Sequence, residues 1–294
     1  MDLSDIGTVR AVLARHGFHF SHSLGQNFIV DPGVCPKMAD LCGASEVSGV
    51  LEIGPGFGVL TRELSARAAK VVAVELDRSL EPVLRETLAD CSNVHVVWGD
   101  VMKLNLRELI RTEFAGMNVA VCANLPYYIT SPVVMRVLEE KLPVSALTVM
   151  VQKEAAERLC ARPGTRACGA VSISIQYYSE PKILFQVPRS SFYPQPKVDS
   201  AAIRLAVRKM PPVSVRDERL FFSLVRAAFG QRRKTAVNAV SAGLALPKEN
   251  VAALFAAVGI PPAARAEQLS MPRFAELADL LSEKGFPKGA NSCE

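Results

Sequence analysis

The sequence predicts an α/β fold in which helices cover both faces of a parallel sheet, followed by a small all-helical domain. Two observations indicate this fold. From about residue 50, short β-branched runs alternate with helix-length stretches, and beyond Arg208-Lys209-Met210-Pro211-Pro212 the patterns are helical only. Strands that are separated by helix-length crossovers form a parallel sheet. Because 294 residues exceed the usual size of a single domain, we expect two domains, residues 1–209 and 210–294.

The individual elements follow from the spacing of apolar residues. The expected strands are residues 50–53, 70–75, 94–98, 118–122, 147–152, 173–178 and 200–207. A helix is expected over residues 59–69, where Leu60 and Leu64 are spaced four apart, and another over residues 79–89. Residues 220–229 keep one apolar face, which predicts an amphipathic helix. Ser270 is expected to cap a last helix that has Pro272 in its first turn.

The composition favours a globular protein outside the membrane. Hydrophobic residues make up 49% of the chain and charged residues 21%, and the apolar runs are too short to span a bilayer. The chain opens Met1-Asp2-Leu3-Ser4-Asp5, with acids where a signal peptide carries bases. The seven cysteines form no Cys-x-x-Cys pair, so we expect small core residues rather than a metal site. We therefore expect a cytoplasmic monomer without a metal.

A glycine-rich turn, Gly54-Pro55-Gly56-Phe57-Gly58, follows the first strand and suggests a cofactor site. Such a turn lets the backbone approach a ligand closely, although a tight structural turn uses glycine about as often. Glu75 ends the second strand, where an acid accepts hydrogen bonds from ribose hydroxyls, and Asp100 ends the third, where it can accept from an adenine amino group. The spacing differs from Gly-x-Gly-x-x-Gly, which disfavours a nicotinamide dehydrogenase. It does not exclude that enzyme class, but an adenosine joined to an amino acid would need no pyrophosphate cradle. Gly54 and Gly56 are the candidate glycines beside such a ligand.

The tetrapeptide Asn124-Leu125-Pro126-Tyr127 follows the fourth strand and predicts the chemistry. An adenine N6 amine is a poor nucleophile because its lone pair is delocalised into the ring. Two acceptors, the Asn124 side-chain oxygen and the Leu125 carbonyl held by Pro126, would return electron density to that nitrogen. Tyr127 would stack on the base, and positioning the amine in line with an activated methyl group would suffice for catalysis. The alternative is a structural turn, since Asn and Pro are common turn formers.

Five motifs in order resemble those of the ribosomal RNA adenine dimethyltransferase family, in particular its small-subunit (16S) branch. They are Leu24-Gly25-Gln26-Asn27-Phe28, Glu52-Ile53-Gly54-Pro55-Gly56, Val74-Glu75-Leu76-Asp77, Asn124-Leu125-Pro126-Tyr127 and Phe192-Tyr193-Pro194-Gln195-Pro196-Lys197-Val198-Asp199-Ser200. The match runs from about residue 20 to residue 280. The resemblance implies a Rossmann-like S-adenosylmethionine-dependent methyltransferase sheet with a helical rRNA-binding domain.

The resemblance also implies roles for individual residues. S-adenosyl-L-methionine would contact Asn27, Ile29, Gly54, Glu75, Asp100 and Asn124. Phe192 would face Tyr127 across a flipped adenine, whereas the alternative for Phe192 is a core residue before a Pro-rich loop. The implied reaction is N6,N6-dimethylation of two adjacent adenines near the 3′ end of 16S rRNA during small-subunit biogenesis, on free rRNA or a pre-assembled 30S subunit. One departure is His22, in a stretch where the family commonly has a lysine.

Basic residues gather toward the C-terminal end. Residues 1–200 hold 20 Lys and Arg against 21 Asp and Glu, whereas residues 201–294 hold 14 against 8. Arg232, Arg233 and Lys234 stand in succession beside Gly230, and we expect them to contact RNA phosphates, an exposed helix start being the alternative. Two other interpretations compete with this one. The first is a methyltransferase that acts on one adenine of large-subunit rRNA, and the second is a non-catalytic RNA-binding, assembly or transcription factor with this fold.

Overall fold

In the computed structural model, the described residues are 3, 5–18 and 27–285. Contacts between residues divide the chain into two compact units. The sheet unit comprises Met1–Ala156 and Ser179–Arg208, and the helical unit comprises Glu157–Tyr178 and Lys209–Glu294. The division after Arg208 lies within one residue of the boundary expected from sequence. Residues 157–178, which we expected in the first domain, belong to the helical unit instead.

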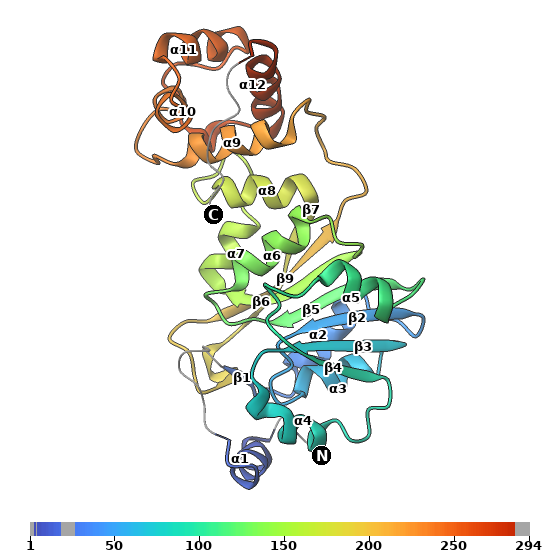
Figure 1. Ribbon diagram of the computed structural model, residues 1–294. Coiled ribbons are helices and arrows are strands. Elements are labelled where there is room, and N and C mark those ends of the chain that lie inside the picture. The colour runs from blue at the N-terminus through green and yellow to red at the C-terminus, as the bar shows by residue number, and fades with distance from the viewer. Residues whose placement is uncertain (1–2, 4, 19–26, 286–294) are drawn as a thin grey trace. The chain divides into compact units, whose positions relative to one another are not determined.

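The described part of the sheet unit forms a seven-stranded sheet with the order β4-β3-β2-β5-β6-β9-β7 (Figure 1). Its strands are β2 (Ser48–Ile53), β3 (Lys70–Glu75), β4 (Val94–Trp98), β5 (Asn118–Asn124), β6 (Ala146–Gln152), β7 (Ser179–Val187) and β9 (Ser200–Val207). The first five strands of this order are parallel. The last two, β9 and β7, are antiparallel to their neighbours. The prediction of an all-parallel sheet is therefore wrong at this edge, where β9 and β7 pair directly without a helical crossover between parallel strands.

The predicted strand at residues 173–178 is also wrong, because these residues form the end of helix α8 (Ala170–Tyr178). A short apolar run rich in isoleucine and tyrosine does not distinguish a buried strand from a buried helix. Here Ile173, Ile175, Tyr177 and Tyr178 are all buried. The sequence therefore shows neither the 3.6-residue period of an amphipathic helix nor the two-residue period of a half-buried strand. The strand begins one residue later, at Ser179, as β7.

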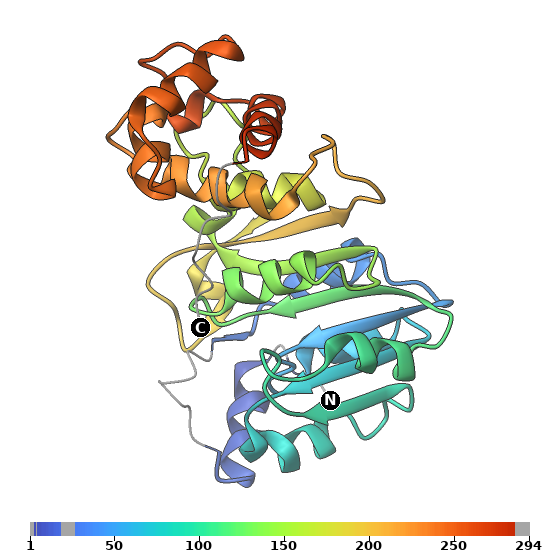
Figure 2. The ribbon, with the colours of Figure 1, turned by 45° about the horizontal axis from the view of Figure 1, so that its top comes forward.

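Helices cover both faces of the sheet (Figures 1 and 2). They are α2 (Val34–Leu41), α3 (Val59–Ser65), α4 (Glu81–Thr87), α5 (Leu106–Glu113) and α6 (Thr130–Glu139), with a 3₁₀ turn η2 at Arg78–Leu80. The connections through α3 and α4 lead from β2 through β3 to β4 at one edge of the sheet. The connections through α5 and α6 lead from β4 back across the sheet to β5 and then to β6. Right-handed crossovers therefore place the two pairs on opposite faces. The direction reverses between β2 and β5, where ligands of such sheets bind.

Two short strands, β1 (Phe28–Ile29) and β8 (Phe192–Tyr193), and helix α1 (Ile6–Arg15) complete the sheet unit. Strands β1 and β8 form an antiparallel pair, with a 3₁₀ turn η3 (Arg189–Ser191) before β8. Helix α1 packs its buried side chains against residues of α4 and against Phe28 and Phe57. Glu86 on α4 forms an ion pair with Arg15, and its second carboxylate oxygen lies 2.5 Å from Nε2 of His16. Residues 19–26, including His22, lie outside the described residues.

The helical unit contains α8, α9 (Glu218–Phe229), α10 (Ala236–Leu244), α11 (Lys248–Ala257), α12 (Met271–Glu283) and the 3₁₀ turn η4 (Ala266–Gln268), while α7 (Lys153–Leu159) lies across the division. Aromatic rings hold α8 to α9, with Tyr178 stacked on Phe222 at a centroid distance of 5.4 Å. Asp217 caps α9 by accepting a hydrogen bond from the Leu220 amide. Ser270 occupies the N-cap position of α12 as predicted, but its side chain makes no capping hydrogen bond.

The cysteines of the described residues carry free thiols. Cys35, Cys42, Cys122 and Cys168 are buried, which confirms them as core residues, whereas Cys91 and Cys160 are half-buried. Across residues 5–18 and 27–285, no helix combines the length and apolarity that a membrane span requires.

Candidate active site

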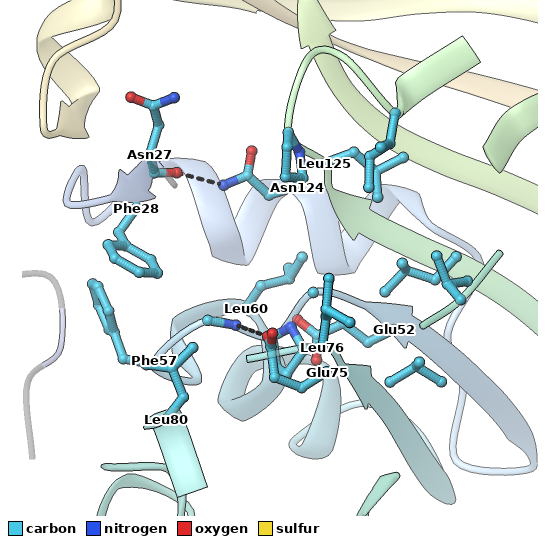
Figure 3. Close-up of a pocket in the computed structure, with 18 of the residues that line it drawn as sticks. Asn27, Phe28, Glu52, Phe57, Leu60, Glu75, Leu76, Leu80, Asn124 and Leu125 are labelled. Carbon is cyan, nitrogen blue, oxygen red and sulfur yellow. Dashed lines mark hydrogen bonds between the residues drawn. The ribbon is translucent and has the colours of Figure 1, made fainter. Parts of the chain in front are cut away.

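A cavity of about 280 Å³ opens at the carboxyl ends of the parallel strands (Figure 3). Its volume is close to the lower end of the range for small-molecule sites, roughly 300 to 1,000 Å³. Every residue that the sequence predicted for cofactor binding or catalysis lines it: Asn27, Ile29, Gly54, Gly56, Glu75, Asp100, Asn124, Leu125, Pro126, Tyr127 and Phe192. The structure thus brings the predicted set into one place. Their individual contacts with a ligand stay predictions.

The glycine turn after β2 has a backbone that side chains rarely adopt. Gly54 has φ +72° and Gly56 has φ +60°, both in the left-handed region. A Cβ on Gly54 would enter open space, whereas a Cβ on Gly56 would lie 2.7 Å from a ring carbon of Phe28. The Phe28 ring in turn packs against Phe57 at a centroid distance of 4.3 Å. Glycine at position 56 therefore allows β1 to close on the turn that borders the cavity.

Gly56→Ala is expected to destabilise the protein by about 1–3 kcal/mol through the positive φ alone, and further through the contact with Phe28. Gly116→Ala is the matched control, because Gly116 has φ +79° with open space around its Cβ position. Urea unfolding should show a larger loss for Gly56→Ala. Equal losses would mean that Phe28 moves aside without cost.

Glu75 holds the glycine turn in place from the end of β3. It is buried, and its two carboxylate oxygens accept hydrogen bonds from the amides of Asp77 at 2.8 Å and Gly56 at 3.3 Å. Burial raises the pKa of Glu75 above its ordinary value. Each oxygen keeps a further lone pair, so the fixed carboxylate can still accept hydrogen bonds from ligand hydroxyls.

Asp100 follows β4 on the same side of the cavity. Its Oδ1 accepts a hydrogen bond from the Met102 amide at 2.8 Å, and its Oδ2 lies 3.8 Å from Lys103 Nζ. Two large apolar side chains beside these acids, Leu76 and Met102, are 52% and 39% exposed. Both line the cavity and can cover an aromatic ring of a ligand. The sequence interpretation missed both residues. For Leu76 its position directly after the strand-end acid Glu75 was a usable signal.

Asn124 is the last residue of β5, and its side-chain orientation is fixed. Its Nδ2 donates a hydrogen bond to the main-chain carbonyl of Asn27, 3.0 Å away (Figure 3). A carbonyl can only accept, so the amide nitrogen must face Asn27 and the side-chain oxygen is left as an acceptor for a ligand. The contact joins residues 97 positions apart, which the sequence could not show.

The aromatic residues of the site differ in exposure. Tyr127 is half-buried, and its hydroxyl lies 2.9 Å from the hydroxyl of Ser200. Leu125 is 2% exposed and anchors the turn in the core, and the Pro126 carbonyl accepts a hydrogen bond from the Ile129 amide at the start of α6. Phe192 is only 3% exposed and belongs to a hydrophobic core cluster of the sheet unit, yet it also lines the cavity. Both the stacking and the core interpretation of Phe192 therefore have support.

Glu52 is a cavity residue that the sequence interpretation did not single out for a role. It is 0% exposed, and among the described residues neither of its carboxylate oxygens has a hydrogen-bond partner. Burial, together with the negative charge of Glu75, raises the pKa of Glu52 to about 8. The Thr61 hydroxyl acts in the opposite direction and lowers this pKa, although no hydrogen bond of normal geometry joins it to Glu52. A buried carboxyl is costly to ionise, so burial favours the neutral acid in the ligand-free protein.

In the helical unit, Arg232, Arg233 and Lys234 are exposed in the loop between α9 and α10. They precede the helix start at Ala236 rather than forming part of it. Arg232 donates from Nη2 to the carbonyl of Arg166, 2.9 Å away, which brings residues 157–178 beside this loop. By sequence the helical unit holds 15 Lys and Arg against 9 Asp and Glu. Among the described residues, no group of three or more potential ligands is arranged to hold a metal ion.

The chain is similar to known proteins over most of its length. The model of the family described as "Ribosomal RNA adenine dimethylase" matches residues 17–283. A ribosomal RNA small subunit methyltransferase A from Alkaliphilus oremlandii is 49% identical over 94% of this chain and 96% of its own length. The protein of the same name from Geobacillus thermodenitrificans is 47% identical over 95% and 97%.

Two solved structures resemble the chain over most of their length. A dimethyladenosine transferase from Plasmodium falciparum superimposes with a TM-score of 0.74 at 26% identity, over 88% of this chain and 98% of that one. The 23S rRNA methyltransferase ErmE superimposes with a TM-score of 0.67 at 26% identity, over 87% and 99%. The likeness therefore includes both the sheet and the helices that follow it.

Proposed function

The chain belongs to the ribosomal RNA adenine dimethylase family, and we propose that it dimethylates the N6 atoms of two adjacent adenines near the 3′ end of small-subunit rRNA. We further propose S-adenosylmethionine as the methyl donor and a cytoplasmic monomer as the active form. The observation that carries the proposal is the fixed acceptor of Asn124, which lies in one cavity with Glu75, Asp100 and Tyr127. Relatives that are 47–49% identical carry the name small subunit methyltransferase, which supports the small subunit over the large one.

The residues of the cavity fit S-adenosylmethionine. Glu75 offers lone pairs for a ribose diol, and Asp100 lies beside apolar Leu76 and Met102, an arrangement suited to an adenine ring. The buried carboxyl of Glu52, which has no hydrogen-bond partner among the described residues, can ionise to provide a counter-charge when a ligand that carries positive charge binds. When bound, the cofactor supplies a methyl group that is already activated by the sulfonium it leaves.

The side chains supply positioning rather than proton transfer. With its nitrogen bound to Asn27, Asn124 presents an oxygen that accepts one N–H of the adenine amine, and the carbonyl of Leu125 accepts the other. These acceptors favour a pyramidal nitrogen whose lone pair is available. The cofactor would supply the methyl group and retain the electron pair of the broken S–C bond on sulfur, and the amine would release its proton to water. Most of the rate gain then comes from orientation.

Binding titrations test the cofactor assignment without the RNA. We expect the protein to bind S-adenosylmethionine and S-adenosylhomocysteine in calorimetry, and not to bind NAD. Glu75→Ala should weaken S-adenosylmethionine binding at least about tenfold because a fixed acceptor is lost. Tight NAD binding, or unchanged affinity in the variant, would contradict the assignment.

The loop of Arg232, Arg233 and Lys234 is proposed to contact RNA phosphates. Each lost phosphate contact should reduce the slope of log affinity against log salt by roughly 0.7–0.9. We expect the variant Arg232→Glu/Arg233→Glu/Lys234→Glu to bind small-subunit RNA more weakly and with a shallower slope in filter-binding titrations. The control Lys248→Glu/Arg273→Glu/Lys284→Glu makes an equal charge change elsewhere in the helical unit. Equal effects of the two variants would show that only net charge matters.

A further inference from the structure

The hydrogen bond between Tyr127 and Ser200 joins the turn after β5 to the first residue of β9. The two hydroxyl oxygens are 2.9 Å apart, and the residues are 73 positions apart in the chain. Ser200 is 0% exposed and is absent from the lining of the cavity, whereas Tyr127 is half-buried and lines it. Ser200 therefore lies behind the tyrosine ring and can reach a substrate only through it.

The position of Ser200 is fixed by the backbone around it. In the sheet, Ser200 pairs with Gln152 of β6 on one side and with Val187 of β7 on the other. The preceding residue, Asp199, accepts hydrogen bonds from the Lys153 amide on its carbonyl and from the Arg189 amide on its carboxylate, each at 3.0 Å. A rigid partner of this kind can transmit its position to a side chain that it binds.

The Tyr127 ring is half-buried. It stands on the turn between β5 and α6, and the neighbouring Tyr128, on the same turn, is 59% exposed. The hydroxyl oxygen lies on the axis about which the ring turns, so a bond to it fixes the position and the long axis of the ring. The preference of a phenol O–H for the plane of its ring then favours one tilt of the ring face. Base stacking depends on that face being parallel to the base.

We propose that Ser200 is a positioning residue that sets the Tyr127 ring as the stacking surface for the target adenine. This inference rests on the proposed function above. It gives a role to the end of the motif that runs from Phe192 to Ser200, which the cofactor and acceptor residues leave unexplained. Ser200 itself touches neither the base nor the methyl donor.

The test breaks the bond from either side and measures methylation of unmethylated small subunits. Ser200→Ala and Tyr127→Phe should each lower kcat about three- to tenfold, the range expected for one hydrogen bond, with an unchanged KM for S-adenosylmethionine. The double variant should be no slower than the slower single variant, because both remove the same interaction. Ser200→Thr, which restores a hydroxyl, should recover most of kcat.

Ser48→Ala is the matched control. Ser48 is a buried serine at the start of β2, and its hydroxyl forms hydrogen bonds with the main chain of Ser45. Ser48→Ala therefore removes comparable hydrogen bonds at the end of β2 that lies away from the cavity. We expect it to lower the unfolding temperature without lowering kcat. A Ser200→Ala enzyme with wild-type kcat, or losses in kcat that simply multiply in the double variant, would overturn the inference and leave the proposed function intact. A wild-type protein that does not methylate small subunits would overturn both.

Discussion

Asn124→Ala is expected to lower the rate of methyl transfer by about 100- to 1,000-fold, the loss seen when a fixed polar group at a reacting centre is removed. The alanine variant loses the oxygen that accepts from the adenine amine. It also removes the hydrogen bond that the Asn124 amide donates to the carbonyl of Asn27 at 3.0 Å. Single-turnover methylation of small subunits, with RNA affinity measured in parallel, is the appropriate measurement. RNA affinity should change little because the loop that we propose to bind RNA lies in the helical unit.

Asn118→Ala is the control for this result. Asn118 is the exposed first residue of β5, at the opposite end of the same strand from Asn124. It should retain the wild-type rate. If Asn124→Ala reduced RNA binding and methylation equally, the chemical role of Asn124 would be contradicted.

Glu52→Gln is expected to stabilise the ligand-free protein, and increasingly so as the pH rises. The pKa of Glu52 is about 8 in the folded protein against a model value of 4.5. For an acid whose pKa is raised by folding, stability is fully present below the unfolded pKa and is lost as the pH rises through the folded pKa. Since one pKa unit corresponds to about 1.4 kcal/mol, the wild-type protein should lose on the order of 4 kcal/mol through this group by pH 8.

The glutamine variant lacks this titration, because its amide stays neutral. Urea unfolding of both proteins without ligand, at pH 5 and at pH 8, gives the difference in the free energy of unfolding. The difference should be small at pH 5 and should reach several kcal/mol in favour of glutamine at pH 8. Binding of a cationic ligand should narrow the gap, because the ionised carboxylate then has a counter-charge. A difference that does not change with pH would show that Glu52 has a polar partner in the folded state.

The strand-end residues could be predicted because a physical rule places them. In a parallel sheet the carboxyl ends of neighbouring strands meet at one edge. Glu75, Asp100 and Asn124 each stand at such an end, so their sequence positions alone were enough to bring them into one cavity. The glycines of the turn were recognisable for a related reason, since their left-handed backbone requires that residue type.

The other features depend on contacts between distant parts of the chain. The apolar residues of α8 pack against α9 in the helical unit, and this burial makes a helix of a run that reads as a strand. The bond from Tyr127 to Ser200 and that from Asn124 to Asn27 likewise join residues far apart in sequence. Glu52 reads as one acid in a buried strand, and only the packed structure shows that its carboxylate oxygens have no hydrogen-bond partner among the residues it describes.

The central claim is tested most directly by finding where the methyl groups go. The protein would be incubated with labelled S-adenosylmethionine and, separately, with unmethylated small subunits and unmethylated large-subunit RNA, and the modified nucleosides identified by mass spectrometry. We predict N6,N6-dimethyladenosine in the small subunit alone. Label confined to the large-subunit RNA would contradict the target, and no label in either, with S-adenosylmethionine still bound, would contradict the proposed methylation of ribosomal RNA.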